Sequence, residues 1–364
     1  MSMKIDSWGG ANIAPGRRKR LRLEIGKTFS GANVSLPLMV WRAPKDGPVV
    51  GITAAVHGDE INGTGSIRRL IQEQLIDLER GALVLVPVIN TMGFERHSRY
   101  MPDRRDLNRC FPGSMQGSLS ARLARLIFDE VVGRCDYLID LHTAAVRRTN
   151  YPNVRADCTD EGCARLARAF GCEVIVDAAG PEGSLRREAS LNGCPAIVLE
   201  AGEVWKVEPA VQDLTLRGIS NILAELGMTP GKPEPPHYQI TVRETRWLRA
   251  ESGGFLHFHV GPGDIVSAGQ AIATNTSLLG SEQEVIRSPL QGIVMGMTTM
   301  PAVSQGDPVV HIGTPSSDRQ HFRLEKSIDG LESDSIETQL REHLATNIVV
   351  SVLEDDRNGE IDNR

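Results

Sequence analysis

Short apolar runs alternate with segments of helical periodicity from residue 49 to residue 226. The apolar runs predict buried strands at 49–56, 82–89, 137–141, 174–176 and 196–199. The periodic segments predict helices at 67–76, 120–132 and 215–226. A strand-helix alternation of this kind is typical of an α/β domain in which helices cover a sheet.

The chain changes character at a proline-rich segment, 229–236, which follows a helix-terminating Gly227. Beyond it, short strands punctuated by glycine contain a faint duplication, in which 254–273 resembles 292–310. Two similar halves predict a small barrel or sandwich, and a chain of 364 residues is expected to form two domains. The predicted units are an α/β domain at 1–232, an all-β domain at 236–315 and an acidic tail at 316–364 with one helix near 336–344.

Charge and composition exclude several classes of protein. The net charge is −6, and residues 315–364 account for it, with twelve acidic and six basic side chains. The basic run at 17–22 could contact nucleic acid, but six basic-rich residues beside a charge-balanced chain favour a solvated edge strand instead. No apolar run is long enough for a membrane helix, and the sequence begins without the pattern of a secretory signal. The six cysteines form no C-x-x-C pair, as expected of reduced thiols in a soluble cytoplasmic protein.

Three polar side chains directly follow three of the predicted strands. They are, with the strand that each follows, His57 (49–56), His142 (137–141) and Glu200 (196–199). If these strands are parallel, the side chains meet at the carboxyl edge of the sheet, where α/β proteins bind ligands. Glu60 lies three residues beyond His57, and two imidazoles with one carboxylate form the ligand set of a catalytic zinc site. Each residue alone also has a structural interpretation, as a hydrogen-bonded histidine or a glutamate in the first turn of a helix.

A polar segment at 98–109 contains four arginines, Arg99, Arg104, Arg105 and Arg109. It holds too many polar and turn-forming residues for a core strand, so we expect a loop. Arginine binds carboxylates through paired hydrogen bonds and stabilises a developing oxyanion. The segment is therefore a candidate for substrate recognition, although a solvated loop is the preferred interpretation of Arg104 and Arg105.

Several separated motifs carry a family resemblance: His57-Gly58-Asp59-Glu60, Asn90, Ser98-Arg99, Asp106-Leu107-Asn108-Arg109, Phe111-Pro112-Gly113, Asp140-Leu141-His142 and Leu199-Glu200-Ala201-Gly202. Their types and order resemble the succinylglutamate desuccinylase/aspartoacylase family, relatives of the zinc carboxypeptidases. The resemblance covers residues 45–205 and continues to about residue 315. It implies a three-layer mixed sheet of the zinc-exopeptidase kind, followed by an all-β barrel-sandwich domain similar to those of biotinyl and lipoyl carriers.

The resemblance also implies roles for individual residues. His57, Glu60 and His142 would bind one zinc ion per chain. Glu200 would act as the general base that takes a proton from the attacking water and as the acid that returns it to the leaving amine. Arg99 would polarise the scissile carbonyl and hold the oxyanion. The residues expected to grip the substrate carboxylate are Asn108, Arg109 and Arg186.

Some of these assignments have rivals in the sequence. Arg104 competes with Arg99, because the spacing between Arg99 and Asn108 varies among relatives. Arg187 lies beside Arg186, and Glu203 lies near Glu200, which the match favours. Asp140 suits an orienting carboxylate better than a ligand. Cobalt, manganese or iron could also occupy two imidazoles and a carboxylate.

The predicted all-β domain cannot carry a cofactor in the way of biotinyl and lipoyl domains. Those domains attach their cofactor to a lysine on a hairpin, and no lysine occurs between Lys232 and Lys326. We therefore expect this domain to shape the substrate entrance or to contact other copies of the chain. The preferred interpretation of its three histidines is as ordinary surface residues: His257, His259 and His311.

The sequence thus predicts a zinc-dependent amidohydrolase that removes an acyl group from an N-acylated amino acid or a similar carboxylate-bearing small molecule. Two alternatives are a zinc carboxypeptidase acting on a peptide C-terminus and a non-catalytic ligand-binding relative. The expected partner is a small N-acyl substrate. Nucleic acid and membrane are not expected partners, and formation of a homo-oligomer is left open.

Overall fold

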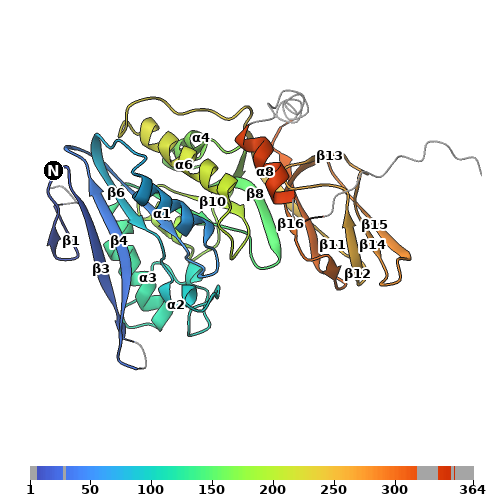
Figure 1. Ribbon diagram of the computed structural model, residues 1–364, viewed down its shortest axis with the longest axis horizontal. Coiled ribbons are helices and arrows are strands. Elements are labelled where there is room, and N and C mark those ends of the chain that lie inside the picture. The colour runs from blue at the N-terminus through green and yellow to red at the C-terminus, as the bar shows by residue number, and fades with distance from the viewer. Residues whose placement is uncertain (1–5, 28–29, 318–334, 346–347, 349–364) are drawn as a thin grey trace, which may run out of the picture.

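A twelve-stranded mixed sheet runs through the computed structural model, which describes residues 6–27, 30–317, 335–345 and 348. The strand order is β13-β16-β18-β11-β9-β8-β10-β7-β5-β6-β4-β3. In chain order these strands are β3 Arg18–Lys27, β4 Asn33–Arg42, β5 Lys45–Ala54, β6 Arg80–Val86, β7 Tyr137–His142, β8 Arg148–Ala156, β9 Val174–Asp177, β10 Ala196–Gly202, β11 Ile240–Arg249, β13 Ile265–Val266, β16 Gly292–Thr298 and β18 Pro308–Pro315. Helices gather around one end of the molecule, and the other end is rich in strands (Figure 1).

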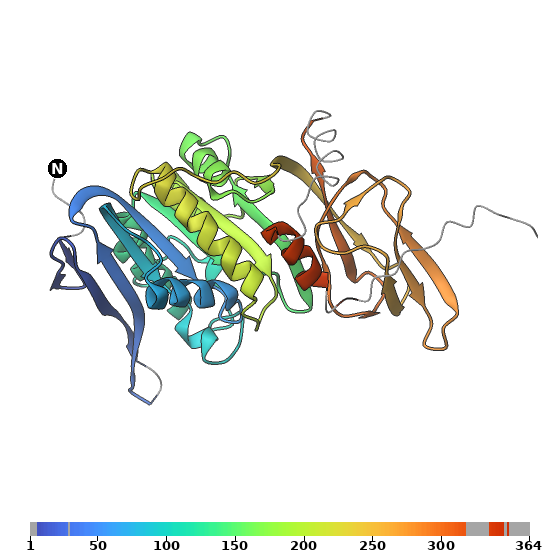
Figure 2. The ribbon, with the colours of Figure 1, turned by 45° about the horizontal axis from the view of Figure 1, so that its top comes forward.

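Helices cover both faces of the sheet because consecutive residues of its central strands are apolar, so both faces of these strands must be buried. The helices are α1 Asn62–Glu73, α2 Thr91–Phe94, α3 Leu119–Glu130, α4 Glu161–Phe170, α5 Leu185–Leu191, α6 Pro209–Glu225 and α8 Ile336–Ala345. One apolar cluster joins Ile52 and Ile139 to residues of α1, α4, α6 and α8. A second joins Val49 and Leu138 to residues of α3 and α5. Figure 2 shows α1, α6 and α8 lying along the same face.

The five predicted strands correspond to β5, β6, β7, β9 and β10, although β5 ends at Ala54 and β6 at Val86, short of the predicted ends at 56 and 89. β5 pairs with β7 and β7 pairs with β10, in both cases parallel. The three strands that precede His57, His142 and Glu200 are therefore parallel, which is the condition for these side chains to meet at one edge of the sheet. The register places Glu200 directly opposite His142.

Other elements extend or refine the prediction. The three predicted helices correspond to α1, α3 and α6, although α1 and α6 begin earlier than expected. The basic run lies mostly in β3, which is the terminal strand of the large sheet, so the expected edge strand is confirmed. The sequence pattern did not predict β4 or β8, and β8 runs antiparallel to β10.

The strands beyond residue 240 pair as two related halves. A second sheet of four strands has the order β15-β14-β12-β17. Its strands are β12 Gly254–Phe258, β14 Ala271–Thr276, β15 Glu282–Arg287 and β17 Ala302–Val303. The short strand of each half pairs with the other half, since β13 pairs with β16 and β17 pairs with β12. The duplication in the sequence is thus repeated in the strand pairing, and the barrel-sandwich relationship stays a prediction.

Main-chain pairing joins this β-rich part to the α/β part. β11 runs parallel to β9, and β16 pairs antiparallel with β8. The large sheet therefore continues across the predicted boundary at 232–236, and the division into domains stays a prediction. The remaining strands, β1 Ser7–Trp8 and β2 Ala11–Asn12, form a separate two-stranded sheet.

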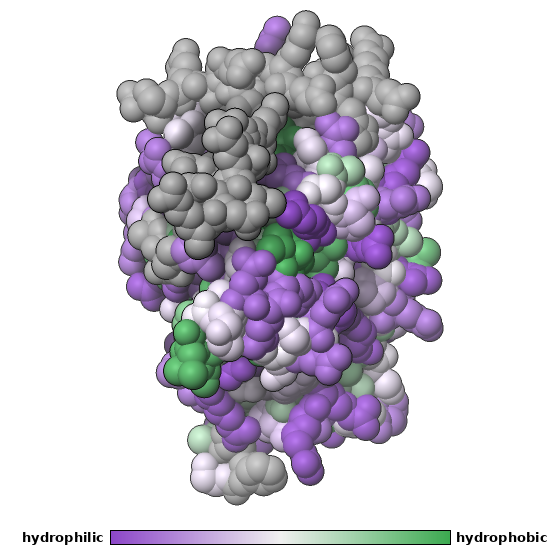
Figure 3. All heavy atoms as spheres, turned by 90° about the vertical axis from the view of Figure 1, so that its right-hand side faces the viewer, coloured by the Kyte–Doolittle hydropathy of each residue, from purple (hydrophilic) through white to green (hydrophobic). Residues whose placement is uncertain are grey.

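The surface of the β-rich end is mainly hydrophilic where Figure 3 shows it in colour. Apolar exceptions in this part include Phe255, Leu278 and Leu279, of which the last two lie between β14 and β15. Scattered exposed apolar side chains are normal on a folded protein. They supply no argument for a particular partner, so association with other copies stays a prediction.

The helix predicted in the acidic tail is present as α8, and the rest of the predicted tail lies largely outside the described residues. Arg341 of α8 donates to Glu173 at 2.8 Å and to the Tyr238 hydroxyl at 3.1 Å. Its guanidinium also lies 5.1 Å from the ring centroid of Tyr151. Burial raises the pKa of the Glu173 carboxyl, whereas Arg341 and its hydroxyl neighbours oppose that rise. This polar cluster attaches α8 to the sheet.

Replacing Arg341 by Met is expected to lower the free energy of unfolding by about 3 kcal/mol, because it leaves the Glu173 carboxylate buried without its cation. Denaturant unfolding followed by circular dichroism measures this change. The double variant Arg341→Met/Glu173→Gln should lose less stability than Arg341→Met alone. A single variant within about 0.5 kcal/mol of the wild type would contradict the proposed attachment.

Two further expectations can be compared with the structure. The six cysteines all lie among the described residues and are present there as thiols rather than disulfides. In the part of the chain that is described, no helix is both long enough and apolar enough to cross a membrane.

Candidate active site

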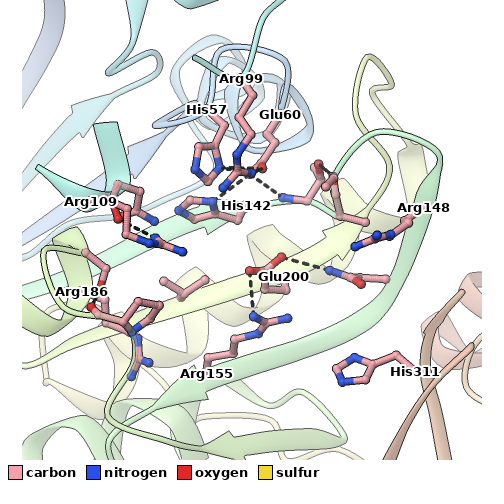
Figure 4. A pocket seen from close by; sticks show the side chains of 18 of the residues that line it. His57, Glu60, Arg99, Arg109, His142, Arg148, Arg155, Arg186, Glu200 and His311 are labelled. Atoms are coloured by element: carbon pink, nitrogen blue, oxygen red, sulfur yellow. Dashed lines mark hydrogen bonds and ion pairs between the residues drawn. The ribbon is translucent and has the colours of Figure 1, made fainter. Parts of the chain in front are cut away.

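A cavity of about 300 Å³ opens at the carboxyl ends of β5, β7 and β10. All eight site residues predicted from the sequence line it: His57, Glu60, Arg99, Asn108, Arg109, His142, Arg186 and Glu200. They come from strand ends, loops and the helix α5, far apart in the sequence, and Figure 4 shows those of them that it labels around one space. The parallel arrangement of the three central strands is what brings them together.

The two predicted histidine ligands meet at the carboxylate of Glu60. His57 Nδ1 lies 2.6 Å from Glu60 Oε1, and His142 Nδ1 lies 2.8 Å from Glu60 Oε2. One ligand atom from each residue lies within 4.8 Å of the other two, and all three residues are buried. This donor set of two imidazole nitrogens and a carboxylate oxygen fits a divalent metal ion such as zinc.

The backbone around His57 explains the glycine in its motif. A Cβ at Gly58 would lie 2.2 Å from the backbone of Gly93, so the position has no room for a side chain. The Asn90 side chain accepts from the Gly93 amide at 2.8 Å and caps the short helix α2. Close packing of these two loops holds His57 at the end of β5.

A second carboxylate orients each histidine from behind. His142 Nε2 lies 2.8 Å from Asp140, whose other oxygen accepts a hydrogen bond from Thr53 at 2.7 Å. His57 Nε2 lies 3.2 Å from Asp106. Both rings therefore turn Nδ1 toward Glu60 and Nε2 toward a carboxylate, an arrangement usual for metal-binding histidines. Asp140 has the orienting position expected of it. Asp106, quoted only as part of a motif, has the same position behind His57.

The electrostatics of the cluster reflect this close packing of opposite charges. Burial alone would raise the pKa of Glu60, but the nearby imidazoles of His57 and His142 hold it below its usual value. Burial would lower the pKa of His142, whereas Asp140 and Glu60 raise it well above the usual value. The carboxylates thus create a strongly negative environment around the imidazoles, which favours a bound cation.

Arg99, rather than its rival Arg104, lies at this cluster. Arg99 Nη1 is 3.2 Å from His57 Nδ1 and 3.3 Å from Glu60 Oε1. Its Nη2 donates to Asp106 at 2.9 Å, and its carbonyl oxygen accepts from Asn90 at 3.3 Å. Arg104 is exposed and does not line the cavity.

Glu200 lies on the cavity wall outside the ligand cluster, with both carboxylate oxygens held. Oε2 accepts from Asn150 at 3.0 Å, and Oε1 lies 3.4 Å from Arg155 Nη1. The rival Glu203 instead pairs with Lys206 at 3.0 Å and does not line the cavity. Of these two glutamates, only Glu200 lines the cavity, and it does not belong to the ligand cluster.

The predicted carboxylate-binding residues differ in how they are held. The Asn108 side chain accepts from the Leu185 amide at 2.8 Å, whereas Arg109 is exposed at the cavity wall. Arg186 is only 6% exposed and donates to the Ala178 carbonyl at 2.9 Å. Burial and the charge of Arg155 lower the pKa of Arg186. Arg187 donates to Gly180 and lines a different cavity, so Arg186 is the residue that lines this one.

The cavity also contains residues that the sequence analysis did not assign: Arg148, Asn150, Arg155, Trp247 and His311. The interpretation of His311 as an ordinary surface residue is wrong. It lines the cavity and stacks on Trp247 with ring centroids 4.7 Å apart. The local sequence could not indicate that His311 lines the cavity, because only the pairing of β11 with β18 places its ring opposite that of Trp247. For Arg148, Asn150 and Arg155, the mixed polar and apolar sequence at 148–155 gave no strand signal.

The fold and the cavity define a protein whose His-Glu-His cluster lies at the carboxyl ends of three parallel strands of a mixed sheet, beside a glutamate and several arginines. The family model for the succinylglutamate desuccinylase/aspartoacylase catalytic domain matches residues 46–226, and the chain belongs to this family. The resemblance seen in the sequence is thereby confirmed.

Three relatives illustrate the similarity. N-alpha-acetyl-L-2,4-diaminobutyric acid deacetylase from Halomonas elongata is 25% identical over 281 residues, which cover 73% of this chain and 82% of the relative. A succinylglutamate desuccinylase/aspartoacylase structure from Rhodobacter sphaeroides is 25% identical with a TM-score of 0.71, covering 84% of this chain and 98% of its own. The product-bound ectoine utilization protein EutE (DoeB) from Ruegeria pomeroyi shares the fold, with a TM-score of 0.73 and 23% identity over 83% of this chain and 97% of its own.

Proposed function

We propose that the chain is a zinc-dependent deacylase that hydrolyses the amide bond of an N-acylated amino acid or a similar carboxylate-bearing small molecule. The observation that carries the proposal is the His57–Glu60–His142 cluster beside Glu200 in a single cavity. The family and the deacetylase relative support hydrolysis of an acyl amide. The donor set supports zinc, at one ion per chain.

Bound zinc would supply Lewis acidity, which lowers the pKa of water from about 15.7 to about 7. The chain's own part is proton transfer by Glu200. Its carboxylate would take a proton from the attacking water and return it to the nitrogen of the leaving amine. Asn150 and Arg155 hold that carboxylate from two sides, which fixes its orientation toward the cavity.

The arginines would bind the charged parts of the substrate and of the transition state. Arg99 lies nearest the ligand cluster, so it would polarise the scissile carbonyl and hold the developing oxyanion. Asn108, Arg109 and Arg186 would grip the substrate carboxylate. The burial of Arg186 supports this role. Its guanidinium donates to a neutral carbonyl, so a bound anion would stabilise this buried charge further.

The size and composition of the cavity favour a small substrate over a peptide. Trp247 and His311, from the β-rich part, form one wall, and the volume is about 300 Å³. We therefore assign the β-rich part to shaping the substrate entrance. A non-catalytic binding protein would need neither Glu200 nor a His-Glu-His cluster, so the presence of both in one cavity supports a catalytic role.

The substrate in the name of the Halomonas elongata deacetylase carries a second amine. The charged side chains that line this cavity are unfavourable for such a compound. Five arginines line the cavity against two carboxylates, Glu60 and Glu200. An additional cationic group on the substrate would be repelled there. Acidic or neutral N-acyl amino acids are thus favoured over N-acetyl-2,4-diaminobutyrate.

A substrate screen combined with metal analysis tests the proposal. The purified protein is assayed against N-acetyl and N-succinyl amino acids and against short peptides with free C-termini. We expect hydrolysis of N-acyl amino acids that depends on bound metal, with slower or no cleavage of the peptides. Preferential release of C-terminal residues from peptides would favour the carboxypeptidase. Binding without hydrolysis would favour the non-catalytic relative.

A further inference from the structure

The turn between β14 and β15 exposes two neighbouring leucines. Leu278 is 89% exposed and Leu279 is 96% exposed. A main-chain hydrogen bond nonetheless closes the turn, since the Ser277 amide donates to the Ser281 carbonyl at 2.8 Å. Glycine, proline, asparagine, aspartate and serine predominate in turns, so two adjacent leucines are unusual there. We call residues 277–281 the leucine turn. On their own, its leucines identify no partner.

A groove of about 480 Å³ lies beside the edge of the large sheet. Residues of α1, of β4 and of the terminal strand β3 form most of it. Its apolar side chains are buried or half-buried, whereas its arginines are exposed, so an apolar surface lies beneath a cationic rim. We call it the edge groove and define it by three apolar residues and three arginines: Pro37, Met39, Ile71, Arg20, Arg22 and Arg68.

The charges of the two surfaces are complementary. The edge groove is lined by three arginines and by no carboxylate. Among the described residues, no carboxylate lies within 4.0 Å of these three guanidinium groups. The hairpin that carries the leucine turn, residues 271–286, contains Glu282 and Glu284 but no basic residue. Opposite charges around two apolar surfaces favour their encounter and fix their relative orientation.

The two surfaces lie at opposite ends of the molecule, so they cannot meet within one chain. Figure 1 shows β3 and β4 at one end and β14 and β15 at the other, and Figure 2 shows the same separation in a second view. We propose that the leucine turn of one copy of the chain inserts into the edge groove of a second copy. Glu282 and Glu284 then face the arginines of the groove. This proposal does not depend on the proposed function.

The proposed contact joins two different surfaces, so it does not close when two copies meet. A pair of copies still offers one leucine turn and one edge groove, and the assembly therefore grows beyond a dimer into a ring or a chain. Two leucines and a groove of about 480 Å³ make a small contact, so we expect weak and reversible association.

Sedimentation velocity of the purified chain, from about 10 μM to about 1 mM, measures this association. The wild type is expected to form species larger than a dimer as its concentration rises. Leu278→Ser/Leu279→Ser should weaken association at least about tenfold, because it removes the apolar side chains that the groove buries. Arg20→Glu/Arg68→Glu should weaken it by a similar factor, because it places like charges opposite the glutamates of the hairpin.

Two rescue experiments identify the contact. A mixture of the leucine variant and the arginine variant holds one intact turn and one intact groove, so we expect dimers and no larger species. Adding Glu282→Arg/Glu284→Arg to the arginine variant restores opposite charges, and association should return to within about threefold of the wild type. Rescue requires folded chains, so it also separates loss of the contact from loss of structure.

Matched controls change exposed residues outside both surfaces. Arg17→Glu/Arg96→Glu reverses two charges and Leu191→Ser removes an exposed leucine, and both variants should associate as the wild type does. A wild type that stays monomeric over the whole concentration range would overturn the proposal. Association that survives in the leucine variant or in the arginine variant, as for a two-fold dimer through another face, would also overturn it.

A membrane is the alternative occupant of the leucine turn, and it is tested by cosedimentation of the same proteins with phosphatidylcholine vesicles. We expect no binding, because the glutamates beside the turn disfavour insertion into a bilayer. A monomeric wild type that binds these vesicles, with binding lost in Leu278→Ser/Leu279→Ser, would assign the turn to a membrane and overturn the proposed contact.

Discussion

Glu200→Gln is expected to keep its bound metal and to lose about 10²- to 10⁴-fold in kcat, the usual contribution of a general acid-base group. In the wild type, Asn150 donates a hydrogen bond to Glu200 Oε2. The amide of the variant retains the shape of the side chain and can still contact Asn150. It cannot take a proton from water, so hydrolysis slows while the ligand cluster is unaffected. Steady-state kinetics and elemental analysis of the same sample measure both quantities.

Glu203→Gln is the matched control, because it changes a neighbouring glutamate that pairs with Lys206 outside the cavity. Its kcat should stay within about twofold of the wild type. If Glu200→Gln turns over at a near-normal rate, Glu200 is not the base. If Glu203→Gln is the inactive variant, the two glutamates have been assigned the wrong way round.

Arg99→Gln is expected to lower kcat by about 10²- to 10³-fold, the cost of removing an oxyanion donor. The reason is its position, 3.3 Å from Glu60 at the edge of the ligand cluster, where a scissile carbonyl would develop charge. KM should change much less than kcat, because the interaction strengthens in the transition state. The metal content must be checked in parallel, since Arg99 also contacts Asp106, which orients His57.

Arg104→Gln provides the comparison, because Arg104 is the rival in the sequence and is exposed in the structure. Near-normal kcat is expected for this variant. A large loss in Arg104→Gln combined with normal turnover in Arg99→Gln would reverse the assignment of the two arginines.

The ligand cluster and Glu200 could be predicted from the sequence because three of these four residues directly follow a recognisable strand and Glu60 lies three residues beyond His57. His57, His142 and Glu200 end apolar runs, and the parallel pairing of β5, β7 and β10 converts that local pattern into proximity. Arg99 could be favoured over Arg104 only weakly, since both lie in one polar loop. Contacts with Glu60 and Asp106 distinguish them, and those contacts depend on how the loop packs.

The positions of Arg148, Asn150, Trp247 and His311 in the cavity could not be predicted, because these residues meet only through long-range strand pairing. Arg148 and Asn150 lie on β8, whose mixed polar and apolar sequence gave no strand signal. Trp247 and His311 reach the cavity because β11 continues the sheet beyond β9 and pairs with β18. The proline-rich segment before β11 suggested a boundary between domains. The sequence therefore did not predict that β11 and β18 belong to the same sheet as β9 and place these two rings at the cavity.

Zinc stoichiometry in the wild type and in Glu60→Gln tests the metal site at the centre of this account. Glu60 supplies the carboxylate that both imidazoles face, at 2.6 and 2.8 Å. We predict one zinc ion per wild-type chain, loss of amide hydrolysis on chelation, recovery when one equivalent is restored, and little bound zinc in Glu60→Gln. Full zinc occupancy in Glu60→Gln, or undiminished hydrolysis by the metal-free wild type, would contradict the account.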